Sequence, residues 1–321
     1  MIANPYRNAS FFDFFLQFAT RLWLFVTGQI PLNELASDEI QIIVLMGVSA
    51  SAALIGSFLV LRKMTMLANS LSHTILLGIV LAFVFTPYNL LEDGQQQINI
   101  QIMLLAALFI GFLTAFLTEF LHKVAKLQED ASTGLVFTSL FALGIILATL
   151  LTRNSHIGTE VIMGNVDALH LDDCKLVLII LGLNVASVLL FFKEFKITTF
   201  DSGLARSLGI SPTWFNYLLM AQVSITTLAA FRAVGVLMLL AFITGPVLTA
   251  RMLTHHLNRL ILLSIGIGCL ASLVGVALSR HLLSTYDLAL STGGLVVCII
   301  TLFFWITLAI THFKKSVPLK A

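Results

Sequence analysis

Apolar residues run along most of this 321-residue chain in stretches of about twenty, the length that a helix needs to cross roughly 30 Å of hydrocarbon. The apolar/polar alternation of a membrane β-barrel strand is absent. The pattern therefore predicts an all-α, polytopic integral membrane helical bundle with about 8–10 transmembrane helices. Nine spanning segments are expected at residues 40–61, 64–87, 98–121, 133–152, 174–192, 213–230, 233–250, 260–279 and 291–312.

Two of the breaks between these spans are very tight. Arg62 and Lys63 interrupt the first pair, and Arg232 with Gly235 indicates a turn inside one continuous apolar stretch. Charged residues and glycine are typical of the points where apolar helices end. We expect short turns at both places.

Residues 11–28 differ from the spans because their phenylalanines fall on one helical face and their polar residues on the other,. We favour a helix lying at the membrane interface. A tenth span is the alternative, and a signal peptide lacks its basic start and A-x-A site. The expected organisation is an N-terminal segment (1–39), a transmembrane permease domain (40–312) and a cytoplasmic tail (313–321).

Composition supports the membrane class. Hydrophobic residues make up 58% of the chain and charged residues 11%, with a mean hydropathy of +1.00, whereas soluble domains carry about 25% charged residues. A net charge of +2 implies no nucleic-acid partner. The three cysteines are far apart in sequence, which indicates neither a disulfide framework nor a structural zinc site,.

The placement of charge predicts the orientation. If the C-terminal tail is cytoplasmic, twelve of the 18 basic residues lie on that side, as the positive-inside rule requires,. These basic residues are Arg62, Lys63, Lys123, Lys126, Lys193, Lys196, Arg206, Arg251, Arg259, Lys314, Lys315 and Lys320. The opposite side receives the acidic residues Glu34, Asp38, Glu39, Glu92, Asp93, Glu160, Asp167, Asp172 and Asp173.

Asn69 and His73 stand four residues apart, on one face of the second predicted span,. His73 lies roughly 14 Å along that span, near mid-membrane. An ionisable residue at this depth is costly and therefore suggests function, and imidazole is a common ligand of Zn²⁺, Mn²⁺ or Fe²⁺. The alternative is that His73 hydrogen-bonds a neighbouring helix.

The chain contains no motif of a nucleotide-binding or hydrolytic enzyme. The phosphate loop GxxxxGK[ST], HExxH and GxSxG are all absent,. This chain is therefore expected not to be an enzyme, and any ATP hydrolysis would occur on a separate subunit. A secondary active transporter of a metal ion or small solute is the alternative, although such proteins normally hold several ionisable residues at mid-membrane.

Residues 56–73, GSFLVLRKMTMLANSLSH, resemble the signature of the ABC-3 family of metal permeases, close to GxFLVLRRMxLxGDALSH. Further matches follow in order, and together they are far more specific than any one of them. They lie at residues 128–144, 163–165, 199–209, 233–246 and 249–251. The resemblance implies a membrane permease subunit of an ATP-driven importer of divalent Mn, Zn or Fe, located in the bacterial cytoplasmic (inner) membrane.

The resemblance also implies roles for particular residues. The Asp and His that line the family's metal path correspond here to Asn69 and His73. An amide lacks the charge with which a carboxylate compensates a desolvated dication. Either metal binds more weakly at this point, or a second permease supplies the carboxylate. We favour a heterodimer over a homodimer.

Residues 200–210 are similar to the family's coupling helix, which contacts the ATPase. Asp201 can cap this short helix, Gly209 can end it, and its leucines can dock into a partner. The residues expected to contact the ATPase are Phe200, Asp201, Leu204, Ala205, Leu208 and Gly209. The expected partners are a cytoplasmic ATP-binding subunit, an extracytoplasmic metal-binding protein, a second permease and the lipid bilayer. The metal is substrate, and no permanently bound cofactor is expected.

Overall fold

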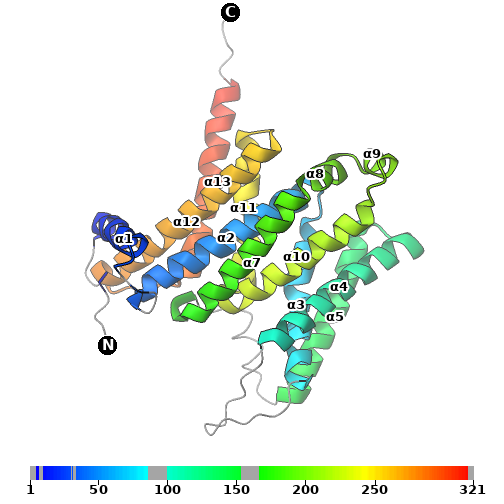
Figure 1. Ribbon diagram of the computed structural model, residues 1–321, viewed down its shortest axis with the longest axis horizontal. Helices are drawn as coiled ribbons and strands as arrows, with labels where there is room; N and C mark the ends of the chain where they lie inside the picture. The colour runs from blue at the N-terminus through cyan, green and yellow to red at the C-terminus, as the bar shows by residue number, and fades with distance from the viewer. Residues whose placement is uncertain are drawn as a thin grey trace, which may run out of the picture.

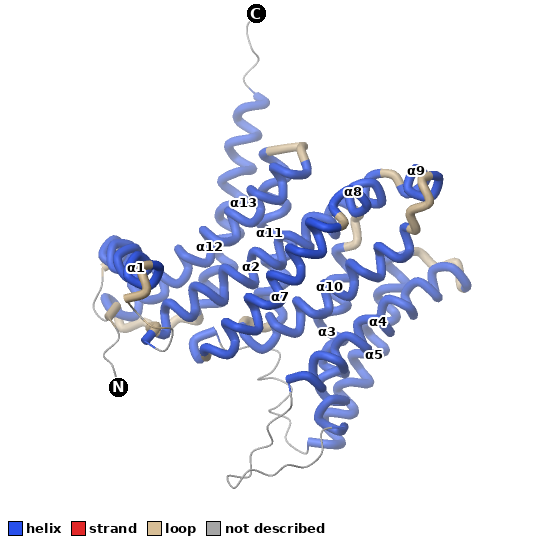
Figure 2. The backbone as a smooth tube through the Cα atoms, in the orientation of Figure 1, coloured by secondary structure: helices blue, strands red, loops and turns tan. Residues whose placement is uncertain are grey.

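Every apolar run that the sequence predicts as a span forms a helix in the computed structural model, which describes residues 5–6, 10–29, 31, 34–85, 100–152 and 166–316. Within these ranges the chain has helices and loops and no strand (Figure 2). The elements are α1 (Phe11–Val26), α2 (Ser37–Leu61), α3 (Thr65–Phe85), α4 (Ile100–Val124), α5 (Glu129–Thr152), η2 (Val166–Ala168), α7 (Leu171–Leu190), α8 (Phe192–Phe200), α9 (Ser202–Ser207), α10 (Pro212–Ala233), α11 (Val236–Leu253), α12 (Leu257–Tyr286) and α13 (Thr292–Ser316).

The nine expected spans correspond to α2, α3, α4, α5, α7, α10, α11, α12 and α13. Eight of these helices are long and apolar enough to cross a membrane, and α11 is a shorter apolar helix. The helical membrane bundle is therefore confirmed. The boundaries of 1–39, 40–312 and 313–321 stay a prediction, with α2 beginning at Ser37 and α13 ending at Ser316.

Helix α2 forms the centre of the bundle. Its span is 89% buried, and α7, α10, α11 and α12 all pack against it. On one side α3, α4 and α5 form a group of their own, and on the other α13 packs against α11 and α12 (Figure 1). Helix α10 joins the first group to the centre, because it contacts α3 and α4 as well as α2 and α7.

Glycines permit the closest approaches to α2. A Cβ on Gly56 would collide with the backbone carbonyl of Ile243 in α11, and one on Gly268 of α12 would collide with the Ser49 hydroxyl. Small residues let helix backbones approach where there is no hydrophobic force between helices in lipid. Gly56 and Gly268 therefore serve packing.

Both expected tight turns are present. Between α2 and α3 the backbone of Lys63 adopts a φ of 62°, and between α10 and α11 that of Gly235 adopts 79°. Such positive φ values reverse a chain in few residues. The α2–α3 turn lies at the same end of the bundle as α8, because Arg62 in this turn hydrogen-bonds Thr198 and Thr199 of that helix.

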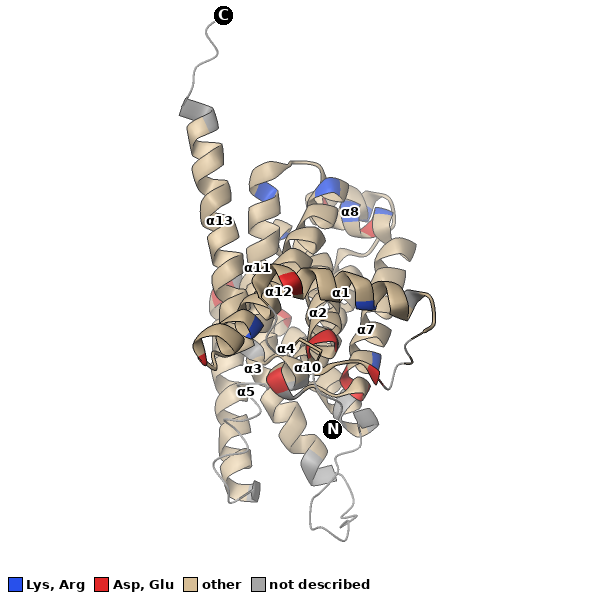
Figure 3. Ribbon diagram, turned by 90° about the vertical axis from the view of Figure 1, so that its left-hand side faces the viewer, with Lys and Arg blue, Asp and Glu red and all other residues tan. Residues whose placement is uncertain are grey.

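Charge segregates between the two ends of the bundle. Lysines and arginines gather around α8, whereas most carboxylates lie toward the opposite end (Figure 3). Three basic residues at that opposite end are each paired with a carboxylate. These pairs are Arg21 with Glu39, Lys175 with Asp172, and Arg280 with Asp38. Pairing leaves the excess of positive charge around α8, as the predicted orientation requires.

Helix α1 lies across the end of the bundle rather than along it (Figures 1 and 3). Ser10 caps it by accepting a hydrogen bond from the Asp13 backbone N–H,. Its aromatic face packs inward through Phe14, which is almost fully buried. The crosswise position agrees with the prediction of an interfacial helix, which stays a prediction.

Several sequence-predicted features lie outside the described residues. They are the acidic residues Glu92, Asp93 and Glu160, the short match at residues 163–165, and Lys320 in the tail.

Candidate functional site

Asn69 and His73 lie on consecutive turns of α3, both half-buried. Within the described residues neither side chain makes a hydrogen bond, although the backbone carbonyl of Asn69 accepts one from the Ser72 hydroxyl at 2.7 Å. The alternative expected from the sequence, in which His73 bonds to a neighbouring helix, is therefore not realised among these residues. The imidazole nitrogens and the amide oxygen remain available to a ligand.

Two aromatic rings of α5 lie beside His73. Its ring centroid lies 5.3 Å from that of Phe137 and 5.5 Å from that of Phe141. Both phenylalanines belong to the sequence match at residues 128–144, so the structure brings two of the matched segments together. Close to them, the position where a Cβ on Gly144 would lie is 3.2 Å from the Leu77 backbone nitrogen. Helices α3 and α5 are thus held in close contact beside His73.

The described part of the chain contains no group of three or more His, Cys, Asp or Glu side chains that could hold a metal ion. From α3, Asn69 and His73 offer one amide oxygen and one imidazole. Transition-metal sites in proteins commonly use four or more donors. A complete metal site built on this pair would need further donors.

The segment that carries α9 is built as the sequence predicts. The Asp201 carboxylate accepts hydrogen bonds from the backbone N–H groups of Gly203 and Leu204, each at 2.9 Å, and so caps the helix,. Gly209 follows the helix with a φ of 77°. Ala205 is buried against the neighbouring helices. The short helix is fixed at both ends and on one face.

The opposite face of this segment is exposed and apolar. Phe200, Leu204 and Leu208 expose 61%, 50% and 59% of their surfaces. A cluster of large apolar side chains on a rigid projecting element is typical of a protein–protein contact. All six residues expected to contact the ATPase lie between the end of α8 and the residues just after α9, a helix that Figure 1 places at one end of the bundle.

Arg62 is the residue whose importance the sequence did not reveal, because its charge was explained by the positive-inside rule alone. In the structure its guanidinium donates hydrogen bonds to Thr199 at 3.0 Å, Thr198 at 2.7 Å and the Asn216 amide oxygen. Burial lowers the pKa of Arg62 to about 10, so it stays charged at neutral pH,. Arg62 joins the α2–α3 turn to both helices that flank α9.

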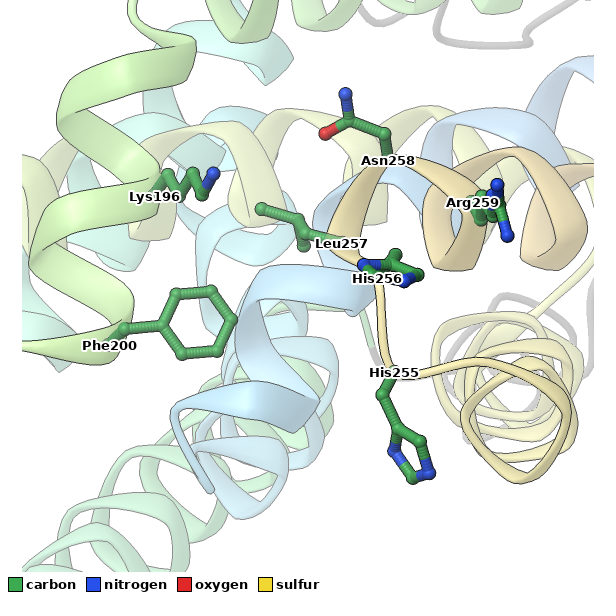
Figure 4. A pocket seen from close by; sticks show the side chains of 7 residues that line it. All are labelled: Lys196, Phe200, His255, His256, Leu257, Asn258 and Arg259. Atoms are coloured by element: carbon green, nitrogen blue, oxygen red, sulfur yellow. The ribbon is translucent and has the colours of Figure 1, made fainter.

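A polar groove of about 450 Å³ lies beside this junction. Lys196 and Phe200 of α8 form one wall. The other wall is formed by His255 and His256, in the turn between α11 and α12, and by Arg259 in the first turn of α12 (Figure 4). Both histidines are exposed. The cationic surface of this end of the bundle therefore continues from α8 to the start of α12.

Comparisons with known proteins agree with this architecture. A sequence model of the ABC 3 transport family matches residues 39–311. A probable metal transport system membrane protein of Chlamydia muridarum is 40% identical over 318 residues, covering 99% of this chain and 98% of the relative. The manganese transport system membrane protein MntD of Bacillus subtilis is 38% identical over 241 residues, which are 71% of this chain and 78% of the relative.

A solved structure shares the fold. In PsaBC from Streptococcus pneumoniae in complex with Fab, one chain superposes with a TM-score of 0.73 and 24% sequence identity, covering 94% of this chain and all of that one. The family match extends over most of the sequence and confirms the resemblance found in its motifs. The chain is a multi-pass membrane permease and belongs to the ABC 3 transport family.

Proposed function

We propose that this chain is the translocation subunit of an ATP-driven importer for a divalent transition metal, Mn²⁺, Zn²⁺ or Fe²⁺, in the bacterial cytoplasmic membrane. ATP is hydrolysed on a separate cytoplasmic subunit, and an extracytoplasmic binding protein delivers the metal. Family membership and relatives named for metal transport support this proposal.

The observation that carries the proposal is the exposed apolar face of α9. Leu204 and Leu208 lie in and directly after the capped helix α9, and Phe200 ends α8 beside it, at the end of the bundle where the basic residues gather. That end is cytoplasmic by the positive-inside rule, where ATP is available. An ATPase that binds this face in one nucleotide state more tightly than in another would shift the permease between its two access states.

Asn69 and His73 are the proposed contribution of this chain to the metal path. Their side-chain polar atoms make no hydrogen bond to the described residues around them, and His73 lies in the middle part of α3. A second permease, different from this chain, supplies the carboxylate that Asn69 cannot. Charge from that carboxylate offsets the cost of desolvating the dication.

Arg62 connects the proposed ATPase contact at α9 to the proposed metal path on α3. Movement of α9 displaces α8 and α10, and both carry acceptors for the Arg62 guanidinium. Arg62 lies three residues before the start of α3. Three charge-assisted hydrogen bonds therefore transmit a shift at α9 to the helix that bears Asn69 and His73.

The proposal is tested by disrupting the expected ATPase contact at α9. The double variant Leu204→Asp/Leu208→Asp puts two charges on the exposed face, and we expect the cognate ATPase to dissociate during purification, with metal uptake lost. The control is Leu127→Asp, an exposed leucine at the turn between α4 and α5, outside the α9 segment. If the ATPase stays bound to the double variant and uptake continues, α9 is not the contact.

A further inference from the structure

An apolar groove of about 580 Å³ lies beneath α1, at the end of the bundle opposite α9. Its volume is within the range of about 300–1,000 Å³ for small-molecule sites. Three helices contribute its walls. The apolar lining consists of Phe18, Leu22 and Phe25 from α1, Leu35 just before α2, Ile43 within α2, and Leu171, Cys174 and Leu178 from α7.

Specific contacts hold α1 above this groove. The Arg21 guanidinium pairs with Glu39 of α2 and donates a hydrogen bond to the Glu34 carbonyl at 3.3 Å. The Tyr6 hydroxyl donates to the same Glu39 carboxylate at 2.7 Å. Burial is the main cause that raises the pKa of Tyr6, and the hydrogen bond to the Glu39 carboxylate raises it further. The hydroxyl therefore keeps its proton. These contacts join α1 to α2, while α7 forms the other wall of the groove.

The wall on α7 continues into its outward-facing apolar surface. Leu178 is 50% exposed and lines the groove, and Ile179 and Leu183 on the same helix are also exposed. Only 33% of the α7 span is buried in the chain. On a spanning helix such a surface faces hydrocarbon, so the groove is open to the same acyl chains that cover α7.

Charge at the groove fits a phospholipid. Lys175 is the one charged α7 residue in the lining, and its side chain is 71% exposed although it also pairs with Asp172 at 3.1 Å. Arg21 and Glu39 neutralise each other, and the Asp172 partner of Lys175 lies outside the lining. Because an ion pair this exposed is weak, the Lys175 ammonium can exchange Asp172 for a lipid phosphodiester,. A lysine near the end of a spanning helix extends its ammonium toward the headgroups.

We propose that this groove binds one acyl chain of an anionic glycerophospholipid of the outer leaflet, with the lipid phosphodiester against the Lys175 ammonium. The lipid fills the space between α1 and α7 and so completes the attachment of the N-terminal helix to the bundle. This inference concerns the end of the molecule opposite α9 and does not depend on the transported substrate.

The experiment uses the full chain in the complex in which it assembles, reconstituted in nanodiscs. The probe is phosphatidylglycerol with a diazirine on one acyl chain, and matched phosphatidylcholine is its zwitterionic counterpart. After illumination, mass spectrometry locates the labelled residues. We expect label from phosphatidylglycerol to concentrate on Leu22, Phe25 and Leu178, above the level on Leu183 and the rest of exposed α7.

Two tryptophan variants form a matched pair. Leu178→Trp fills the groove and should lower labelling of α1 several-fold, whereas Leu183→Trp changes a leucine of similar exposure on the same helix but outside the groove and should leave it unchanged. Lys175→Gln should remove the preference for phosphatidylglycerol over phosphatidylcholine.

Three outcomes would overturn the proposal. They are uniform labelling along α7, equal effects of the two tryptophan variants, and crosslinking of groove residues to a second protein chain in place of lipid. Persistence of the anionic preference in Lys175→Gln would contradict the headgroup assignment.

Discussion

The middle of α3 differs from the junction around α9, formed by Arg62 with its three acceptors and by Asp201, in whether polar side chains have hydrogen-bond partners. At the junction, the Arg62 guanidinium donates to three acceptors and the Asp201 carboxylate accepts from two backbone N–H groups. On α3, Asn69 and His73 make no side-chain hydrogen bond within the described residues. The rings that lie beside His73 belong to phenylalanines of α5, which cannot satisfy an imidazole N–H by ordinary hydrogen bonding.

The difference is informative because a buried polar group without a partner is costly. A junction whose guanidinium is held by three hydrogen bonds transmits displacement as a rigid unit, whereas side chains that keep their donors and acceptors free can bind a passing ion. The comparison thus supports the proposal that the junction couples the permease to the ATPase and that the middle of α3 contacts the substrate. Four substitutions test the assignment, in order of decreasing expected effect.

His73→Ala should abolish metal uptake. Removing the imidazole deletes a ligand outright, and since loss of even a supporting contact around a metal costs about 10–100-fold, we expect uptake to fall by more than about 100-fold. Uptake of radioactive Mn²⁺, Zn²⁺ and Fe²⁺ in a deletion strain measures this. Co-purification of the ATPase should be unaffected, and His312→Ala, an exposed histidine on α13, is the control. Normal uptake by His73→Ala would remove His73 from the path.

Arg62→Gln should separate ATP hydrolysis from transport. The shorter neutral amide cannot reach Thr198, Thr199 and Asn216 together, and hydrogen bonds to charged groups contribute about 1.5–3 kcal/mol each. We expect the number of metal ions moved per ATP hydrolysed to fall about tenfold, which corresponds to about 1.4 kcal/mol. The neighbouring exposed residue supplies the control Lys63→Gln. An unchanged ratio with the ATPase bound would refute the coupling role while leaving the proposed function intact.

Asn69→Asp should change metal affinity or selectivity by up to about tenfold, about 1.4 kcal/mol, because a carboxylate adds charge beside the dication. Competition between Mn²⁺, Zn²⁺ and Fe²⁺ during uptake is the measurement. Asn69→Ala removes the oxygen and should only weaken transport. Identical profiles for the original chain and Asn69→Asp would show that the metal does not contact this position.

Asp201→Ala should have the smallest effect. Loss of an N-cap costs about 0.5–2 kcal/mol of helix stability. Amide hydrogen exchange in α9 should therefore accelerate, and binding of the ATPase should weaken modestly. Asp201→Asn keeps an oxygen that can accept from Gly203 and Leu204 and should resemble the original chain. If amide exchange in α9 is as slow in Asp201→Ala as in the original chain, the packing of Ala205 alone holds the helix.

Most helices, turns and caps of this protein could be predicted from local sequence patterns. Each apolar run had the length of a spanning helix, so the nine spans were predicted closely, and the turns at Lys63 and Gly235 were marked by charge and glycine. The cap at Asp201 and the end at Gly209 were also predictable, because capping depends on residues close in sequence. The family was recognisable for the same reason, since each of its ordered motifs is a short continuous run of residues.

Contacts between distant segments were beyond the reach of the sequence. Arg62 lies more than one hundred residues from Thr198 and Asn216, and its charge in the sequence is explained equally well by the positive-inside rule. The aromatic surroundings of His73 and the groove between α1 and α7 likewise depend on how helices pack. The sequence by itself determined which segments are helices, where they end and how charge is distributed between their ends. Only the tertiary structure decided which polar groups have partners and which remain free, because hydrogen bonding between helices depends on their relative position.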